Sequence, residues 1–326
     1  MTKLFEAKPF IIAEIGSNWT NFQEAKDSIA FAKKCGADAV KFQAFNYQSL
    51  YGVPIQVDPA SIPGQMPLDW LPKLKEKADA CDIEFMCSAF SPELYDVVNP
   101  FVSVHKIASS ELTYPQLLEK VKSFKKPILL SVGGSAKGDI AQAMQILRGG
   151  PQVVLMYCSS AYPSTMYNLF QMSDLKETFN VPVGFSDHSI DVVYPALSSF
   201  RHFDAVAIEK HVNFTESSAE TPDSGHSLNA YDFRFMCEIL HGIRPFEEFN
   251  PQPEEKDMFL KHNRRLIAIK DIKIGEQFKF GQNYGAFRSL KEDPHGLIPF
   301  VWEEIEKKNL CAGMDIKAGE AIRCFE

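Results

Sequence analysis

The segment FIIAEIGSNWTNFQEAKDSIAFAKKCGADAVKFQ, residues 10–43, contains a complete strand–helix–strand unit. Its apolar, β-branched beginning, residues 10–15, predicts a buried strand, and the apolar spacing of residues 22–36 predicts a helix that Gly36 ends. A second buried strand follows at residues 39–43. Two buried strands joined by a helix predict a parallel pair with a right-handed crossover.

The same unit recurs along most of the chain. Further apolar runs predict strands at residues 83–88, 102–109, 127–131, 153–158, 181–186 and 205–211. Eight such repeats over roughly 240 residues match a (β/α)8 barrel, which typically needs about 250. A doubly wound open sheet would require a glycine-rich phosphate loop after the first strand, which EIGSNWTNF does not supply. We therefore predict an α/β fold of the TIM-barrel type.

The composition changes after the predicted barrel. The segment RPFEEFNPQPEEKD (244–257) holds three prolines and five acidic residues and is typical of a solvated linker. The remaining residues alternate apolar and polar positions around lysine–glycine turns, which predicts a small, mostly β unit. We predict a catalytic barrel at 1–243, a linker at 244–262 and a small β domain at 263–326.

Composition narrows the class of protein. The net charge of −8 and the absence of a basic patch argue against a nucleic-acid or membrane-surface partner. No apolar stretch approaches the ~18 residues that span a bilayer, and MTKLFEAKPF lacks the apolar core of a signal peptide. Seven cysteines without a C-x-x-C pair fit a reduced, cytoplasmic protein.

Polar side chains end every predicted strand. Alternate residues of a barrel strand point inward, and active sites form at the carboxyl ends of the strands. Counting from the apolar positions of each strand gives this inward polar set: Glu14, Lys41, Gln43, Ser88, Lys106, Ser131, Ser160, Ser186, His188, Glu209 and His211. Because all eight strands contribute, the pattern favours a functional site over a polar rim that serves only solubility.

The basic and hydroxyl residues of this set predict an anion site. Lys41 and Lys106 end strands two apart in chain order, and a lysine ammonium neutralises a carboxylate or phosphate as a point charge. The serine hydroxyls at the other strand ends add hydrogen-bond donors for the same anion.

The histidines and carboxylates of the set leave alternatives open. His188 and His211 end consecutive strands, so they could share a divalent ion and leave coordination positions for substrate or water. Two histidines also occur in barrels that bind no metal. Glu14 and Glu209 could act as acid or base, or could serve as partners of the lysines.

The motifs, in chain order, resemble those of the sialic acid synthases. They read FIIAEIGSN, GADAVKFQ, HKIASSEL, KPILLSVGG, YCSSAYP, GFSDHS, EKH and TPDSGHSL. The tail, NRRLIAIKDIKIGE, resembles the C-terminal antifreeze-like (SAF) domain of that family. The likeness covers nearly the whole chain.

The resemblance implies that phosphoenolpyruvate condenses with an open-chain 2-acylamino hexose such as N-acetylmannosamine. The products would be phosphate and a nine-carbon 2-keto-3-deoxy sugar acid of the sialic, legionaminic or pseudaminic type. By resemblance, phosphoenolpyruvate would be held by Lys41, Ser88, Lys106, Ser109, Ser131 and Ser186.

The resemblance also implies a metal, a sugar site and an assembly. A divalent ion, Mn²⁺ or Mg²⁺, would be held by His188 and His211. The sugar would be contacted by Glu14, Gln43, Tyr162 and Asp223. Arg288, from the SAF domain of a partner subunit, would reach the same sugar, which implies a domain-swapped homodimer.

Four positions depart from the family pattern. Trp19 stands where the family usually has a histidine, and Ser160 stands where it often has an asparagine. The arginine–proline–glycine turn of the SAF domain has become FRSLKEDPHGL. The proline–aspartate–histidine motif now carries its histidine two positions later, at His226. His226 could contact the sugar, but we interpret it as a solvated loop residue.

Two other functions compete with this one. A synthase that uses a phosphorylated sugar shares the chemistry, but such relatives lack the SAF tail, and the loops after Gln43 and Tyr162 hold no cluster of lysines and arginines. A sugar-binding scaffold that retains the fold would have lost catalytic positions, whereas Glu14, both lysines and both histidines are present.

Overall fold

The chain forms two compact units, Met1–Pro245 and Phe246–Glu326, each described here by itself. The computed structural model describes residues 9–52, 63–214, 221–242, 263–288 and 296–323. The predicted linker, 244–262, and the segment 289–295 after Arg288 lie outside the described residues. Within the described ranges, no helix is both long and apolar enough to cross a membrane.

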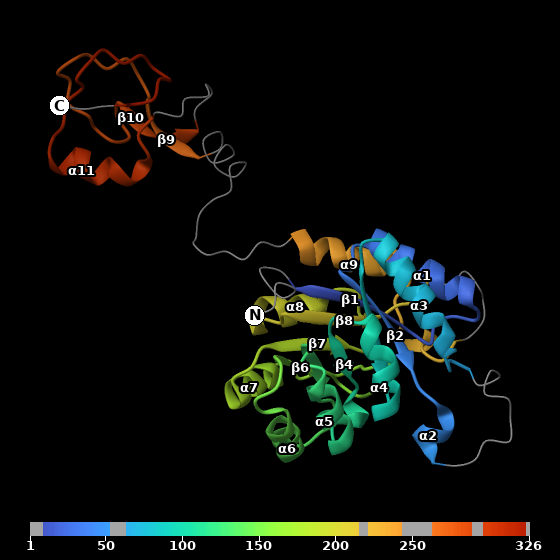
Figure 1. Cartoon of the computed structure of the whole chain (residues 1–326). Coiled ribbons are helices and arrows are strands. Elements are labelled where there is room, and N and C mark those ends of the chain that lie inside the picture. The colour runs from blue at the N-terminus through green and yellow to red at the C-terminus, as the bar shows by residue number, and fades with distance from the viewer. Residues whose placement is uncertain (1–8, 53–62, 215–220, 243–262, 289–295, 324–326) are drawn as a thin grey trace. The chain divides into compact units, whose positions relative to one another are not determined.

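The first unit is a closed barrel of parallel strands in chain order, which confirms the predicted TIM-barrel fold (Figure 1). The barrel closes because β1 pairs with both β2 and β8. Its strands are β1 (Phe10–Gly16), β2 (Ala39–Ala44), β3 (Glu84–Ala89), β4 (His105–Ile107), β5 (Ile128–Ser131), β6 (Val153–Tyr157), β7 (Val183–Asp187) and β8 (Ala207–His211).

Helices follow the strands and surround the barrel (Figure 1). They are α1 (Phe22–Cys35), the short α2 (Tyr47–Tyr51), α3 (Leu71–Ala80), α4 (Pro92–Val98), α5 (Pro115–Ser123), α6 (Lys137–Leu147), α7 (Phe170–Phe179), α8 (Tyr194–Phe203) and α9 (Ala230–Gly242). The first helix shows why the sequence pattern worked. Asn21 accepts a hydrogen bond from the Glu24 amide at its start, and Gly36, at φ 97°, ends it in a left-handed conformation.

The strand residues predicted from the sequence to point inward share their alternation with the apolar residues that fill the barrel interior. One buried apolar cluster fills that interior: Phe10, Ile12, Ala39, Met86, Val104, Leu129, Val154, Met156 and Ala207. A separate, larger cluster joins the outward strand residues to the helices. Since side chains alternate along a strand, the polar residues in phase with the inner cluster lie at the same end of the barrel.

The fourth strand differs from its prediction. It covers only His105–Ile107, although residues 102–109 were expected. A 3-10 turn, Asn99–Phe101, occupies the chain just before it, and the Lys126 ammonium donates hydrogen bonds to the Asn99 and Val102 carbonyls. Val102 consequently packs in the outer core, whereas Val104 belongs to the cluster that fills the barrel interior.

The second unit is small and contains an antiparallel sheet, which is consistent with the small, mostly β unit that the alternation of its sequence predicted. β9 (Arg264–Ala268) pairs antiparallel with β10 (Tyr284–Arg288), and α11 (Trp302–Lys307) follows. Isolated bridges, such as Ile272 with Ile316, connect the remaining turns. Its core is a cluster of its own: Leu266, Ala268, Ile272, Phe278, Tyr284, Ile305, Ala312, Ile316 and Ile322.

We expect Gly184→Val to destabilise the barrel. A Cβ at Gly184, inside β7, would lie 2.4 Å from the Met156 sulfur and 2.8 Å from the Ala207 carbonyl oxygen, and the latter belongs to the backbone of β8. Such overpacking typically costs about 1–3 kcal/mol. Urea unfolding followed by circular dichroism should show a lower midpoint.

Gly138→Ala is the matched control, because a Cβ at Gly138 in α6 would meet nothing within 4 Å. Alanine favours a helix by roughly 0.5–1 kcal/mol over glycine, so the midpoint should stay or rise. An unchanged midpoint for Gly184→Val would contradict the packing described for the barrel interior.

Candidate active site

The register of the barrel brings the predicted polar residues together. Glu14 on β1 lies in register with Lys41 on β2 and with His211 on β8. Ser186 on β7 pairs with Glu209 on β8. Because parallel strands keep their carboxyl ends at one edge, these side chains converge at one mouth of the barrel.

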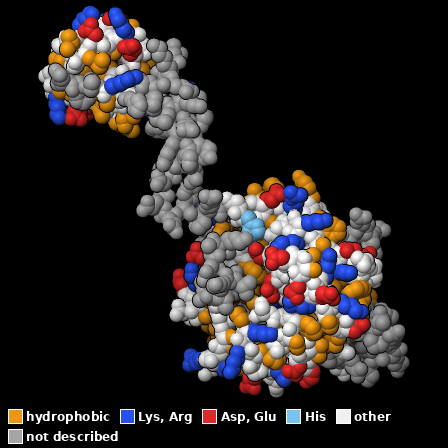
Figure 2. All heavy atoms as spheres, turned by 45° about the horizontal axis from the view of Figure 1, so that its top comes forward, with side chains coloured by type: hydrophobic (Ala, Val, Ile, Leu, Met, Phe, Trp, Pro, Cys, Tyr) orange, Lys and Arg blue, Asp and Glu red, His pale blue; other side chains and the backbone are white. Residues whose placement is uncertain are grey.

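Four of these side chains form a buried ion network. The Lys41 ammonium lies 2.7 Å from Glu14 Oε2 and 3.7 Å from Glu209 Oε2, and the Lys106 ammonium lies 3.4 Å from Glu209 Oε1. All four side chains are at most 4% exposed. The outer surface differs, since Figure 2 shows acidic, basic and hydrophobic side chains interspersed on the visible face of the barrel.

The predicted serines border this network. Ser88 Oγ accepts a hydrogen bond of 3.0 Å from Lys41, and Ser186 Oγ donates one of 3.0 Å to Glu209 Oε1. Ser131 is buried at the carboxyl end of β5. These hydroxyls can reorient toward a ligand, since a hydroxyl both donates and accepts.

Ser109 and Ser160 lie at a second part of the rim, around Cys158. Ser109 Oγ accepts a hydrogen bond from the Gly133 amide and lies 3.2 Å from the Cys158 sulfur. A Cβ on Gly133 would lie 2.2 Å from Ser160 Oγ, so Gly133 leaves room for that hydroxyl. Cys158 is a buried residue of this part of the rim that the predicted polar set does not include.

Burial and ion pairing shift the pKa values of the two carboxyl groups of the network in opposite directions. Burial, reinforced by the charge of Glu209, raises the pKa of Glu14 to about 7 even though Lys41 opposes the shift. Burial would also raise the pKa of Glu209, but Lys106 and Lys41 outweigh it and lower that pKa to about 2. A proton shared by the two carboxylates therefore resides on Glu14, which leaves the network with a net positive charge.

Three imidazoles gather beside the network. The ring centroids of His188 and His211 lie 5.5 Å apart, and those of His211 and His226 lie 4.4 Å apart. His188 Nδ1 donates to the Ser159 carbonyl at 2.9 Å, so its Nε2, which lies 3.3 Å from Ser186 Oγ, carries the lone pair. Burial lowers the pKa of His188 to about 4 and that of His211 well below its usual range. Both rings are therefore neutral, which is the metal-ligating form.

The interpretation of His226 as a solvated loop residue is wrong. His226 is 7% exposed. Its loop is held against β1 because Thr221 Oγ1 donates to Asn18 Oδ1 at 2.6 Å and Asn18 Nδ2 donates to Ser227 Oγ at 2.8 Å. The spacing of the motif alone could not show that these hydrogen bonds turn the histidine inward.

Residues implied for the sugar converge over Gly16. Gln43 Nε2 donates to Glu14 Oε1 at 2.9 Å, and Asp223 Oδ2 accepts a hydrogen bond of 2.8 Å from the Ser17 amide. Gly16 has φ 55°, and a Cβ there would lie 2.3 Å from Asp223 Oδ2 and 3.2 Å from Gln43 Nε2. A side chain at Gly16 would therefore displace both groups.

Two aromatic residues flank the site differently. Tyr162 is 58% exposed, and its ring centroid lies 4.4 Å from that of His188 and 4.9 Å from that of His226. Trp19, which stands where the resembled family has a histidine, is buried and packs edge-on against Trp70 at 5.1 Å. Trp19 is thus a core residue, and Tyr162 covers the imidazoles.

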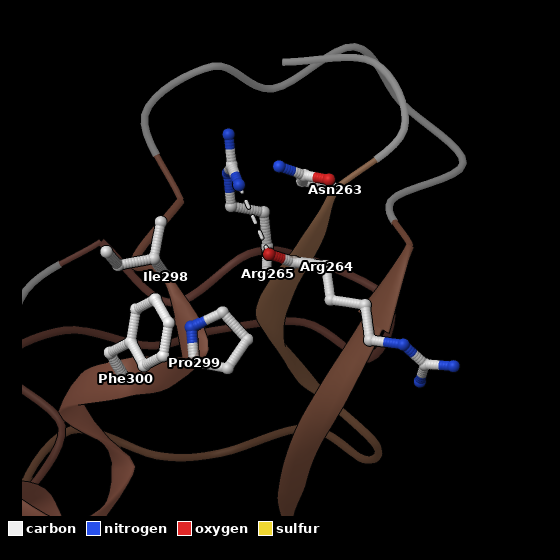
Figure 3. Close-up of a pocket in the computed structure, with 6 residues that line it drawn as sticks. All are labelled: Asn263, Arg264, Arg265, Ile298, Pro299 and Phe300. Atoms are coloured by element: carbon white, nitrogen blue, oxygen red, sulfur yellow. Dashed lines mark hydrogen bonds between the residues drawn. The ribbon is translucent and has the colours of Figure 1, made fainter. Parts of the chain in front are cut away.

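Arg288 lies in the second unit and stays a prediction for the sugar site. It is exposed at the end of β10, where it pairs with Arg264. The Arg264 guanidinium donates to the Ala286 carbonyl. A pocket of about 320 Å³ in this unit lies beside β9; Figure 3 shows the described residues that line it, Asn263, Arg264, Arg265, Ile298, Pro299 and Phe300.

A buried ion pair that sequence reasoning missed supports the imidazoles from outside the barrel. The Lys210 ammonium lies 2.7 Å from Asp187 Oδ2 and donates to the carbonyls of Ser189 and Asp191. It thereby fixes the chain on both sides of His188. The signal was available, because Lys210 and Asp187 are charged residues in the outward phase of buried strands.

Comparison with known proteins places this barrel among sugar-acid synthases. Pseudaminic acid synthase of Helicobacter pylori is 33% identical over 294 residues, which cover 82% of this chain and 85% of the relative. N,N'-diacetyllegionaminic acid synthase of Campylobacter jejuni is 29% identical over 97% of this chain and 99% of its own. The N-acetylneuraminic acid (sialic acid) synthetase structure from Leptospira borgpetersenii superposes with TM-score 0.68 at 26% identity, covering 77% of this chain and 90% of that one.

Residues 28–248 match the NeuB family, and the chain belongs to it. The resemblance to sialic acid synthases noted from the motifs is thereby confirmed. The chain is accordingly an enzyme of this family.

We expect Lys210→Met to destabilise the barrel strongly, because it leaves the Asp187 carboxyl group, which is 1% exposed, without its partner ammonium. Removing one member of a buried pair typically costs about 3–5 kcal/mol. The control, Lys137→Met, removes the exposed pair with Asp174 and should cost about 1 kcal/mol or less. Equal urea midpoints for the two variants would contradict a supporting role for Lys210.

We expect Glu14 to make stability depend on pH. Its pKa of about 7 in the folded chain exceeds its ordinary value near 4.5, so the folded state holds the extra proton between these values. The stabilisation is complete below about pH 4.5 and is lost as the pH rises through about 7. The free energy of unfolding of Glu14→Gln, measured with urea relative to that of the wild type, should therefore rise by about 2 kcal/mol between pH 5 and pH 8. A stability difference between the wild type and Glu14→Gln that stays constant with pH would refute the shift.

Proposed function

We propose that this enzyme condenses phosphoenolpyruvate with an open-chain 2-acylamino hexose, releasing phosphate and a nine-carbon 2-keto-3-deoxy sugar acid. The observation that carries the proposal is the buried pair of ammonium groups, Lys41 and Lys106, surrounded by hydroxyls at the mouth of a barrel. The names of the relatives, pseudaminic and legionaminic acid synthases, support a product of this class.

The charge of the network suits an anionic substrate. With a proton on Glu14, the two lysines outnumber the remaining carboxylate, Glu209. A phosphate or carboxylate entering the mouth would be neutralised by Lys41 and Lys106, and it would accept hydrogen bonds from Ser88 and the neighbouring hydroxyls. Because these donors are already in place, little reorganisation accompanies the reaction.

The reaction proceeds in three stages in this proposal. C3 of phosphoenolpyruvate attacks the aldehyde carbon of the sugar, whose oxygen takes up a proton. Water adds at C2 and loses a proton, and the tetrahedral intermediate then breaks its C–O bond to expel phosphate. Glu14, whose pKa is about 7, is suited to exchange protons with the aldehyde oxygen or the water. Lys41 and Lys106 stabilise the phosphate as its charge grows.

The imidazoles fit a divalent ion, which we propose to be Mn²⁺ or Mg²⁺. His211 Nδ1 is buried and has no hydrogen-bond partner among the described residues, and His188 directs a lone pair from Nε2 into the same mouth. An ion held by His188 and His211 would act as a Lewis acid on the aldehyde oxygen. Tyr162, Gln43 and Asp223 would orient the sugar, with Arg288 of a partner copy completing its site in a domain-swapped dimer.

Phosphate release in the presence of Mn²⁺ tests this function. We expect release from phosphoenolpyruvate to depend on one acceptor among N-acetylmannosamine, its 6-phosphate, mannose and 2,4-diacetamido-6-deoxy hexoses. Lys41→Met should lower kcat/KM about 100-fold or more, because it removes a buried charge that faces the phosphate in the transition state. His211→Ala should abolish turnover.

Lys137→Met, which changes an exposed lysine of α6, serves as the matched control and should retain activity. Turnover only with the 6-phosphate would move the acceptor to a phosphorylated sugar. Absence of phosphate release with every acceptor, from a folded wild-type protein, would favour a sugar-binding scaffold.

A further inference from the structure

We infer that His226 supplies the second imidazole nitrogen of the metal site, so that His211, Asp223 and His226 together hold the ion in place of the pair His188 and His211. The inference rests on the proposed function, which gives the reason to expect a metal ion. It names a site with one protein ligand more than the two-histidine site. It also predicts which ions the site prefers.

The three side chains already present their ligand atoms to one another. One atom from each of His211, Asp223 and His226 lies within 4.8 Å of the other two. His211 Nδ1 is 3.9 Å from Asp223 Oδ2, and His226 Nε2 is 3.9 Å from Asp223 Oδ1. These separations are too long for hydrogen bonds. Two ligand atoms bound to one ion at about 2.1 Å lie at most about 4.2 Å apart, so an ion can bridge such a gap.

Both imidazole nitrogens are buried and lack a hydrogen bond. His211 and His226 are 6% and 7% exposed, and neither His211 Nδ1 nor His226 Nε2 has a hydrogen-bond partner among the described residues. A buried polar atom without a partner costs free energy and is uncommon in folded proteins. An ion between the two rings, whose centroids are 4.4 Å apart, would satisfy both nitrogens at once.

The surrounding residues hold the three groups in place. The Ser17 amide donates to Asp223 Oδ2, and Ser227 Oγ donates to the Asp223 carbonyl. Asp223 directly precedes the 3-10 turn Ser224–His226, so the hydrogen bonds that fix Asp223 also fix His226. Outer hydrogen bonds of this kind orient the ligands of metal sites.

Two imidazoles and one carboxylate favour a particular class of ion. Imidazole suits first-row transition ions, whereas Mg²⁺ prefers oxygen ligands. A site with His226 should therefore take Mn²⁺, Fe²⁺, Co²⁺ or Zn²⁺ in preference to Mg²⁺. Three protein ligands still leave positions open for a substrate oxygen.

The test measures metal binding without substrate. Full-length protein stripped with a chelator is titrated with Mn²⁺, free ion is followed by electron paramagnetic resonance, and nitrogen couplings of the bound ion are recorded by spin-echo methods. We expect the wild type to bind Mn²⁺ even with excess Mg²⁺ present. His226→Phe and His226→Gln should each weaken binding about 10-fold or more and remove one imidazole coupling. His202→Gln, which changes an exposed histidine of α8, should alter neither.

Wild-type affinity and unchanged couplings in His226→Phe, with binding lost in His211→Ala, would overturn the inference and leave the ion on His188 and His211. Mg²⁺ displacing Mn²⁺ as readily from the wild type as from His226→Gln would also overturn it. The result is independent of turnover. A wild type that binds Mn²⁺ as expected but releases no phosphate with any acceptor refutes the proposed function alone.

Discussion

The site depends on a buried network of ion pairs between two lysines and two glutamates. Lys41 and Lys106 are almost completely buried, as are Glu14 and Glu209, so a charge on any of them needs an opposite charge close by. The closed barrel forces them together because each points from its strand into the barrel interior. Breaking any one pair would leave an unpaired charge in a region of low dielectric, which the fold could tolerate only by moving a proton.

That constraint also prepares the site for an anion. The opposite pKa shifts of the two carboxyl groups place a proton on Glu14 before Glu209, which stays ionised between the lysines. The imidazoles beside it stay neutral because burial and neighbouring cations disfavour their charged form. One mouth of the barrel thus combines cations for a phosphate, a carboxyl group able to exchange a proton and neutral nitrogens able to bind a metal.

Contacts outside the barrel interior hold the segments that carry those nitrogens. Lys210 binds Asp187 and two carbonyls around His188, and Asn18 connects the end of β1 to the loop that carries His226. Neither Lys210 nor Asn18 was expected to do this from the motifs. The two residues act on the site only through hydrogen bonds that join segments about 20 to 200 positions apart in the sequence.

The sequence by itself determined the barrel and the polar residues at its mouth. Strand residues alternate strictly between inside and outside, so the phase of Phe10 and Ile12 sufficed to aim Glu14 inward. The tertiary structure decided what lies in the loops, where no such periodicity exists. His226 is buried beside the site, Trp19 packs in the core and Val102 packs outside the barrel interior, because each position depends on contacts with distant segments rather than on local spacing.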